Sequence, residues 1–157
     1  MTTNTLEQET IQSFTIRKEI QIHAPIEVAF QAMLDELGPE GRMPDGKTLS
    51  LKIEPWPGGR WYRDLGNNAG HLWGHVQVIK PPTLLEITGP MPMSYAAANF
   101  LQYRFKEKDG GTHLTFLHSA MGLIPPEHRD GMTEGWQQWL ESIRDLAERK
   151  NPQETKR

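Results

Sequence analysis

Apolar residues recur with helical spacing over residues 125–149, the most strongly patterned stretch of the chain. One face of this stretch carries Met132, Trp136, Trp139, Leu140, Ile143, Leu146 and Ala147. Two prolines, Pro125 and Pro126, suit a first helical turn, where a missing N–H is no loss. The pattern predicts one amphipathic helix of about 24 residues and roughly 36 Å, long enough to cross a small domain. Within it, Gly131 and Gly135 each cost about 1 kcal/mol relative to alanine, which either room for a ligand or close packing on a sheet would explain.

Alternating apolar and polar residues predict strands upstream of that helix. Residues 14–22 form the first, and apolar positions spaced by three and four predict a short helix over 26–37. Turn-rich segments then separate strands at 49–54, 60–65, 71–79, 84–88, 99–108 and 112–121. In the segment 60–65 the alternation puts Trp61 and Leu65 on one side. The order predicts an α+β fold, in which a curved antiparallel sheet wraps around the long C-terminal helix.

Length and composition narrow the classes of function. A chain of 157 residues suits one domain, which we place at residues 13–149, with disordered tails at 1–12 and 150–157. A net charge of -3 offers no basic face for nucleic acid. The lack of cysteine excludes disulfides and thiolate chemistry. No apolar run reaches the roughly 20 residues of a membrane span, and no signal peptide opens the chain, so we expect a cytoplasmic protein.

Four motifs resemble one known family. They are Ile-x-Ile-x-Ala-Pro-x-x-x-Ala-Phe (20–30), Pro-Gly-Gly-Arg-Trp (57–61), Gly-His-Val-x-x-Ile-x-Pro-Pro (74–82) and Gly-Trp-x-x-x-Leu (135–140). In this order they resemble the homologues of the activator of heat-shock chaperone ATPase. That family belongs to the START-like (SRPBCC) superfamily of helix-grip proteins. The resemblance implies a helix-grip fold over residues 14–149, but the superfamily includes carriers, receptors, cyclases and co-chaperone domains, so it does not select a function.

Aromatic and methionine side chains are the candidates for a binding site. A cleft between the sheet and the long helix is expected to bind a small, largely apolar molecule. The expected wall consists of Trp61, Tyr103, Phe105, Phe116, Met132, Trp136 and Trp139. Met91, Met93 and Tyr95, in a loop without charge, are expected to form its gate. His118 shares a face with Leu114 and Phe116 and is expected to supply a polar contact.

Whether the chain is an enzyme stays open at this point. His118 is the weak candidate for a general base in a cofactor-independent cyclase or lyase, and a hydrogen-bonded core histidine is the competing interpretation. No metal site is expected, because His71 and His75 lie about 13 Å apart along one strand. No cofactor is expected either. A chaperone-binding role rests on the family name alone, and pairing of an exposed sheet edge with a second copy is left open.

Overall fold

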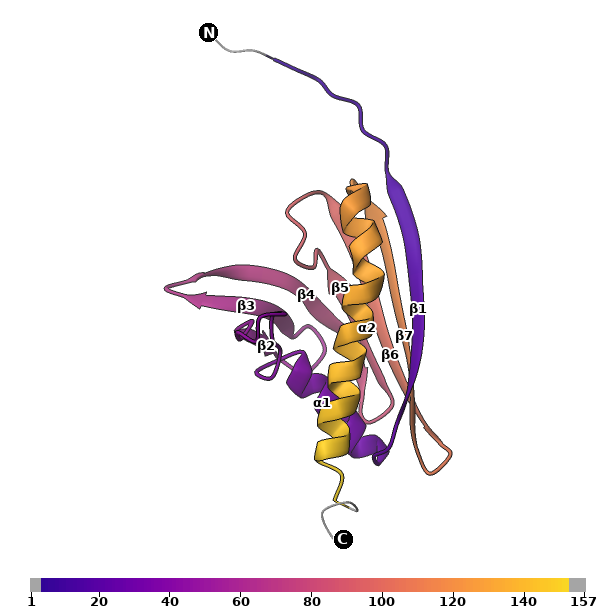
Figure 1. The fold of residues 1–157 in the computed structure, drawn as a ribbon. Coiled ribbons are helices and arrows are strands. Elements are labelled where there is room, and N and C mark those ends of the chain that lie inside the picture. Colours follow the sequence, from indigo (N-terminus) through magenta and orange to yellow (C-terminus); the bar gives the residue numbers. More distant parts are fainter. Residues whose placement is uncertain (1–3, 153–157) are drawn as a thin grey trace.

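The computed structural model describes residues 4–152. It contains one antiparallel seven-stranded sheet in the order β1-β7-β6-β5-β4-β3-β2, and a long helix lies across one face of it (Figure 1). The strands are β1 (Gln12–Ile22), β2 (Leu51–Ile53), β3 (Arg60–Gly66), β4 (Ala69–Lys80), β5 (Leu84–Gly89), β6 (Ala97–Lys108) and β7 (Gly111–Gly122). The helices are α1 (Ile26–Glu36) and α2 (Pro126–Arg149). The predicted α+β helix-grip architecture is confirmed.

Local chemistry accounts for the tight connections in the sheet. Strands β3 and β4 are joined by Asn67 and Asn68, both with positive φ, and β6 and β7 are joined by Asp109 and Gly110 in the same way. Two successive left-handed residues match the twist of an antiparallel hairpin, and asparagine, aspartate and glycine tolerate that conformation. The turn residues therefore fix which strands are neighbours.

Helix α2 buries the apolar face that its sequence predicts. Trp136, Leu140, Ile143, Leu146 and Ala147 are buried, whereas Met132 and Trp139 are partly buried at its margin. The helix packs against α1 and β1. Its other side is solvated, so it covers the sheet as a single layer.

The two glycines of α2 do not mark a close approach to the sheet. Gly131 and Gly135 are both exposed, and a methyl group added at either position would meet no atom within 4 Å. Close packing therefore cannot explain them.

Two other expectations differ from the structure. Leu65 is 58% exposed although Trp61 is fully buried, because the β3–β4 register shifts between Asp64 and Gly66 and breaks the alternation. At the C-terminal end, Asn151 is buried and its side chain donates a 2.8 Å hydrogen bond to the carbonyl of His23. The packed domain thus reaches beyond residue 149. Of the tails predicted to be disordered, residues 1–3 and 153–157 lie outside the described residues.

Candidate functional site

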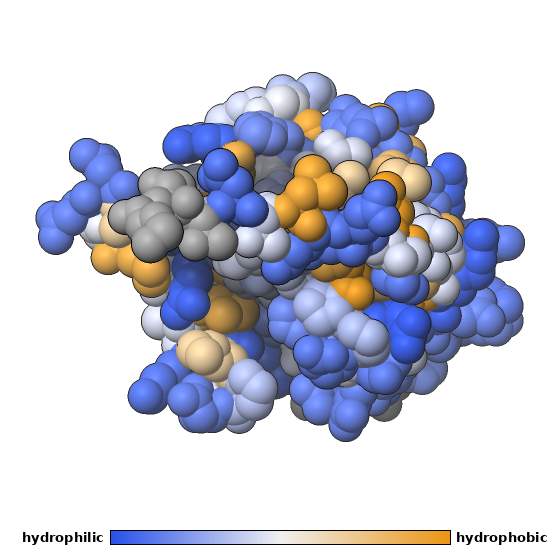
Figure 2. Space-filling model, turned by 90° about the horizontal axis from the view of Figure 1, so that it is seen from above, coloured by the Kyte–Doolittle hydropathy of each residue, from blue (hydrophilic) through white to orange (hydrophobic). Residues whose placement is uncertain are grey.

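A pocket of about 370 Å³ lies between the β5–β6 loop and the N-terminal half of α2. We call it the loop–helix pocket. The loop contributes Met91, Pro92 and Met93, and β7 contributes His118. The helix contributes Glu127, His128, Gly131, Met132 and Trp136. Figure 1 places the loop beside the upper half of α2, and Figure 2 shows hydrophobic atoms exposed among hydrophilic ones at that end of the molecule.

The helix supplies one wall of this pocket through its periodicity. His128, Met132 and Trp136 are four residues apart, so they lie one above another on the same face. Trp136 is buried at the bottom, Met132 is half-buried, and His128 is exposed at the rim. This wall is therefore apolar at the bottom of the pocket and polar at its rim, as in many small-molecule sites.

The opposite wall is a loop held in an unusual backbone conformation. Met91 has a φ of 59°, a left-handed value that is uncommon for a residue with a side chain. Its N–H donates to the carbonyl of Trp73 at 2.8 Å, which ties the loop to β4. Met91 and Met93 are both buried. Such strain persists only where the surroundings impose it, and it is common at ligand sites.

A chain of hydrogen bonds connects the helix to that loop through His118. The indole Nε1–H of Trp136 donates to His118 Nδ1 at 2.9 Å, and His118 Nε2 lies 2.7 Å from Asn99 Oδ1. Asn99 Nδ2 donates in turn to the carbonyls of Gly89 and Pro90. Because the indole is only a donor, Nδ1 must be the acceptor and Nε2 must carry the proton.

These bonds decide what His118 can do in this conformation. Its side chain is fully buried, and burial lowers the pKa of His118 to about 4. The ring is therefore neutral at pH 7. Both nitrogens are occupied, so neither is free to accept a proton from a substrate. His118 therefore lines the pocket with both ring nitrogens already engaged.

A second hydrogen bond involves His128 at the rim of the pocket. The hydroxyl of Tyr95, in the loop, lies 2.7 Å from Nδ1 of His128 on α2, and the two ring centroids are 5.5 Å apart. We call this contact the rim latch. It joins the loop to the first turn of α2, on the solvent side of Met91 and Met93.

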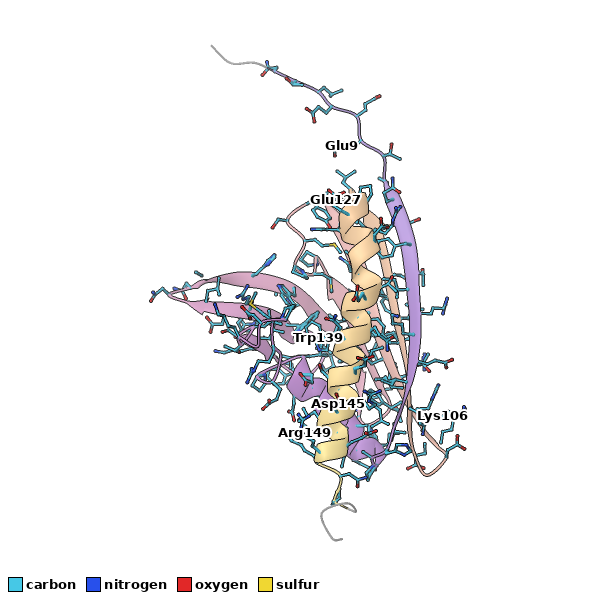
Figure 3. The ribbon with its side chains drawn as sticks, viewed as in Figure 1. Glu9, Lys106, Glu127, Trp139, Asp145 and Arg149 are labelled. Atoms are coloured by element: carbon cyan, nitrogen blue, oxygen red, sulfur yellow. The ribbon has the colours of Figure 1, made fainter. Side chains whose placement is uncertain are left out.

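The other expected wall residues lie in the packed core instead. Phe116 contacts Tyr103 and Trp136, with ring centroids 5.0 and 4.6 Å apart, and Trp139 lies 5.8 Å from Trp136. Figure 3 shows Trp139 midway along α2, on the side toward β3 and β4. These aromatic rings lie beneath the middle of the helix. None of the three residues Tyr103, Phe116 and Trp139 lines the loop–helix pocket.

Trp61 and Phe105 hold the short helix in place. The indole N–H of Trp61 donates to the carbonyl of Leu37 at 2.8 Å, which satisfies a carbonyl just past the C-terminal end of α1. Phe105 packs edge-on against Phe30 of α1, with centroids 5.4 Å apart. Neither residue is among those that line the loop–helix pocket.

Three buried polar atoms in this region have no protein partner among the described residues. They are the hydroxyl of Tyr103 and the indole nitrogens of Trp73 and Trp139. Burial raises the pKa of Tyr103, so it stays protonated. Each unpaired donor costs free energy that a water molecule or a ligand acceptor would recover.

Several residues of this region were absent from the sequence-based site. Asn99 bonds to His118, and His128 completes the rim latch. The spacing of His128 from Met132 and Trp136 was the available signal. Nothing in the sequence could reveal Asn99, because its partner comes from the neighbouring strand.

Another depression, of about 420 Å³, lies on the sheet face that points away from α2. We call it the convex-face pocket. Its outward residues are Ser13, Thr15, Ala98, Phe100, Ser119 and Met121. Within residues 4–152, no cluster of three or more histidine, aspartate or glutamate residues could hold a metal. No helix in the same part of the chain is long and apolar enough to cross a membrane.

Solved structures with the same fold are numerous, and their sequences have diverged. An uncharacterised protein from Rhizobium leguminosarum aligns with a TM-score of 0.71 at 19% identity, covering 90% of this chain and 98% of its own. The Mll3558 protein from Rhizobium loti gives 0.68 at 18%, covering 88% and 99%. The protein Ara h 8.0201 gives 0.61 at 13%, covering 87% and 98%. These likenesses show the fold alone.

Sequence comparisons identify the family more directly. Comparison with curated proteins gives no match. The model of the family described as "Activator of Hsp90 ATPase homolog 1-like protein" matches residues 23–148. That span runs from the end of β1 almost to the end of α2 and includes both walls of the loop–helix pocket. The chain therefore belongs to the Activator of Hsp90 ATPase homolog 1-like family.

Proposed function

We propose that this protein binds a small, largely apolar molecule in the loop–helix pocket. The observation that supports this proposal is a cavity of about 370 Å³ with methionine and tryptophan walls and a polar rim. Its size falls within the range of about 300–1,000 Å³ typical of small-molecule sites. Two residues of the expected wall, Met132 and Trp136, line it, together with His118, the expected polar contact, and with Met91 and Met93 of the expected gate.

Burial of apolar surface is sufficient to drive such binding. Covering about 300 Å² of ligand surface at roughly 25 cal/mol per Å² is worth on the order of 7 kcal/mol before the costs of association. No charged anchor is then needed. Glu127 and His128, both exposed, lie at the entrance and would contact only a polar end of the ligand.

An enzymatic role for His118 is less well supported than binding. A general base needs a free lone pair near the substrate, and the Nδ1 lone pair of His118 accepts the indole N–H of Trp136. A chaperone-binding role gains no support from the described residues beyond the family name.

Calorimetric titration with 1-anilinonaphthalene-8-sulfonate, an aromatic probe, tests the binding proposal. Met132→Trp fills the loop–helix pocket, so the probe's affinity should fall at least tenfold, or about 1.4 kcal/mol. Met121→Trp is the matched control, because Met121 is exposed in the convex-face pocket. Unchanged affinity in Met132→Trp, or a loss confined to Met121→Trp, would place the probe elsewhere and contradict the proposal.

A further inference from the structure

The first strand leaves one edge of the sheet without a strand partner. β1 is a terminal strand and pairs with β7 on one side only. Its outer edge is open along the strand in Figure 1. Such an edge presents backbone N–H and C=O groups that another extended segment can pair with.

An extended segment of this chain continues directly from that strand. Residues 4–11 run away from the body of the molecule as exposed chain, as Figure 1 shows, and Glu9 is labelled on this segment in Figure 3. Leu6 and Ile11 in this segment are 89% and 70% exposed. We call residues 4–11 the N-terminal arm. Both side chains are therefore available for contact with another surface.

Charge suggests which surface the arm fits. The arm carries Glu7 and Glu9, and the middle of β1 carries Arg17 and Lys18. Glu7, Glu9 and Arg17 form no ion pair within residues 4–152, whereas Lys18 donates to Gln137 on α2. An acidic arm and a basic edge on one strand cannot meet within a single copy, because they lie end to end. They can meet between two antiparallel copies.

We propose that two copies of this chain pair through β1, with the arm of each copy extending along the outer edge of β1 in the other. The two-fold axis passes beside Gln12, so residues 6–18 of both chains form one antiparallel ladder. In this register Glu7 lies opposite Arg17 of the partner subunit, and the symmetric contact repeats it. Residues directly opposite in such a ladder share a face and interact.

The register follows from charge and face together. A slip of one residue would turn the apolar face of one strand toward the polar face of the other. A slip of two residues in one direction would set Glu7 against Glu19 of the partner subunit, a repulsive pair. The opposite slip leaves Arg17 facing the neutral Thr5 of the partner subunit. The first of these two-residue slips would also pair Glu9 with Arg17 of the partner subunit, but only the proposed register sets opposite charges against each other without a like-charged pair.

Apolar contacts fit the same register on both faces. Ile11 lies opposite Ser13 of the partner subunit, whose small side chain leaves room toward the convex-face pocket and its exposed Met121. On the other face, Leu6 lies opposite Lys18 of the partner subunit. The ammonium group of Lys18 is directed to Gln137 at 3.1 Å, which leaves its methylene groups to contact Leu6.

Sedimentation velocity over a concentration series tests the pairing with the full chain. We expect a reversible dimer that Glu7→Lys and Arg17→Glu each weaken about tenfold, because each change places like charges opposite each other twice. Combining the two changes restores opposite charges and should return the dissociation constant to within about threefold of the original. Glu134→Lys, an exposed change on α2, is the control. A monomer at every concentration, or single swaps that the combination does not rescue, would overturn the proposal.

Cross-linking tests the register separately, and the absence of natural cysteine removes any background. Gln12→Cys sets two thiols opposite each other across the axis at a separation that a disulfide spans, so oxidation should yield a covalent dimer. Thr10→Cys is the control, because Thr10 faces Phe14 of the partner subunit. Cross-linking through Ser13→Cys in place of Gln12→Cys, or through none of these variants, would show that the register is wrong.

Discussion

At the scale of single residues, the indole–imidazole–amide chain connects helix α2, strands β7 and β6 and the β5–β6 loop through buried side chains. Trp136 belongs to α2, His118 to β7 and Asn99 to β6, and Asn99 also holds two carbonyls at the start of the loop. All three side chains are buried. A fully satisfied buried network fixes geometry, and losing one member leaves its neighbour unpaired.

A comparison of two tryptophans of α2 measures how much the hydrogen bond from Trp136 to His118 contributes to the free energy of unfolding. Trp136→Phe removes the donor to His118 and leaves Nδ1 buried without a partner, so the free energy of unfolding should fall by about 1–3 kcal/mol beyond the packing change. Trp139→Phe is the control, because the Trp139 indole nitrogen has no partner among the described residues. Urea denaturation measures both. Equal losses in the two variants would contradict this account.

His118 should also make stability depend on pH. Its pKa is about 4 in the folded protein and 6.5 for an unperturbed histidine, so the unfolded chain binds more protons between these values. Stability is then full above pH 6.5 and declines as the pH falls toward 4. The total loss should be about 3 kcal/mol, at 1.36 kcal/mol per unit of pKa. Denaturation at a series of pH values measures it.

Other titrating groups contribute to the same curve, so the control must isolate His118. Burial raises the pKa of Glu36, for example, which acts in the opposite direction. His118→Gln keeps a donor and an acceptor but does not titrate. The difference between the two curves should rise with pH between 4 and 6.5. Parallel curves would mean that His118 does not carry this dependence.

The residue scale is where sequence reasoning reached its limit. The alternation of β7 placed His118 correctly on the buried face. It could not supply Asn99, which is aligned beside that histidine by the β6–β7 register. Trp61 and Phe105 were equally apolar candidates for the pocket wall, yet both pack at the α1 side. Which apolar residues line a cavity depends on packing between segments that are distant in the sequence. The periodicity of each segment does not determine that packing.

At the scale of elements, the first half of α2 contains a glycine that lowers helix stability although packing does not require it. Gly135 is exposed in a helix interior, and an added methyl group would meet open space. Gly135→Ala should therefore raise the free energy of unfolding by about 1 kcal/mol. Gly59→Ala is the contrasting control, because its methyl group would clash with the carbonyl of Glu54. A destabilised Gly135→Ala protein would mean that the glycine serves a contact outside this structure.

The rim latch should control entry into the loop–helix pocket. Tyr95→Phe removes the hydroxyl that bonds to His128, so the loop should open more often and the probe should bind and leave several-fold faster. Stopped-flow mixing with 1-anilinonaphthalene-8-sulfonate measures both rates. Tyr62→Phe, on β3 and outside this pocket, is the control. Identical rates in all three proteins would show that the latch does not limit access.

Elements were far more predictable than contacts between them. Both helices begin and end within a residue or two of their predicted limits, because proline and glycine mark their boundaries and a 3.6-residue period marks their faces. Strand β3 was predicted with the wrong side for Leu65, since a register shift depends on its pairing partner. Local sequence patterns thus predicted the helices and strands. The exceptions depend on strand pairing between residues that are distant in the sequence.

At the scale of the whole molecule, one continuous core connects all parts of the fold. Buried residues from both helices and all seven strands form a single cluster. We therefore expect two-state thermal unfolding, with equal calorimetric and van't Hoff enthalpies. The test should use a concentration low enough to keep the chain monomeric. A van't Hoff enthalpy well below the calorimetric one would indicate that α2 or the β3–β4 hairpin unfolds separately.

The row of indoles across the core has an optical consequence. Trp73, Trp61, Trp139 and Trp136 follow one another with ring centroids 5.1, 6.3 and 5.8 Å apart. Electronic excitation passes readily between rings this close, so light absorbed by any of the four can be emitted from another. A quencher that contacts Trp136 alone would then lower the fluorescence of all four tryptophans. Intrinsic fluorescence would therefore reveal whether the loop–helix pocket is occupied, without an added label.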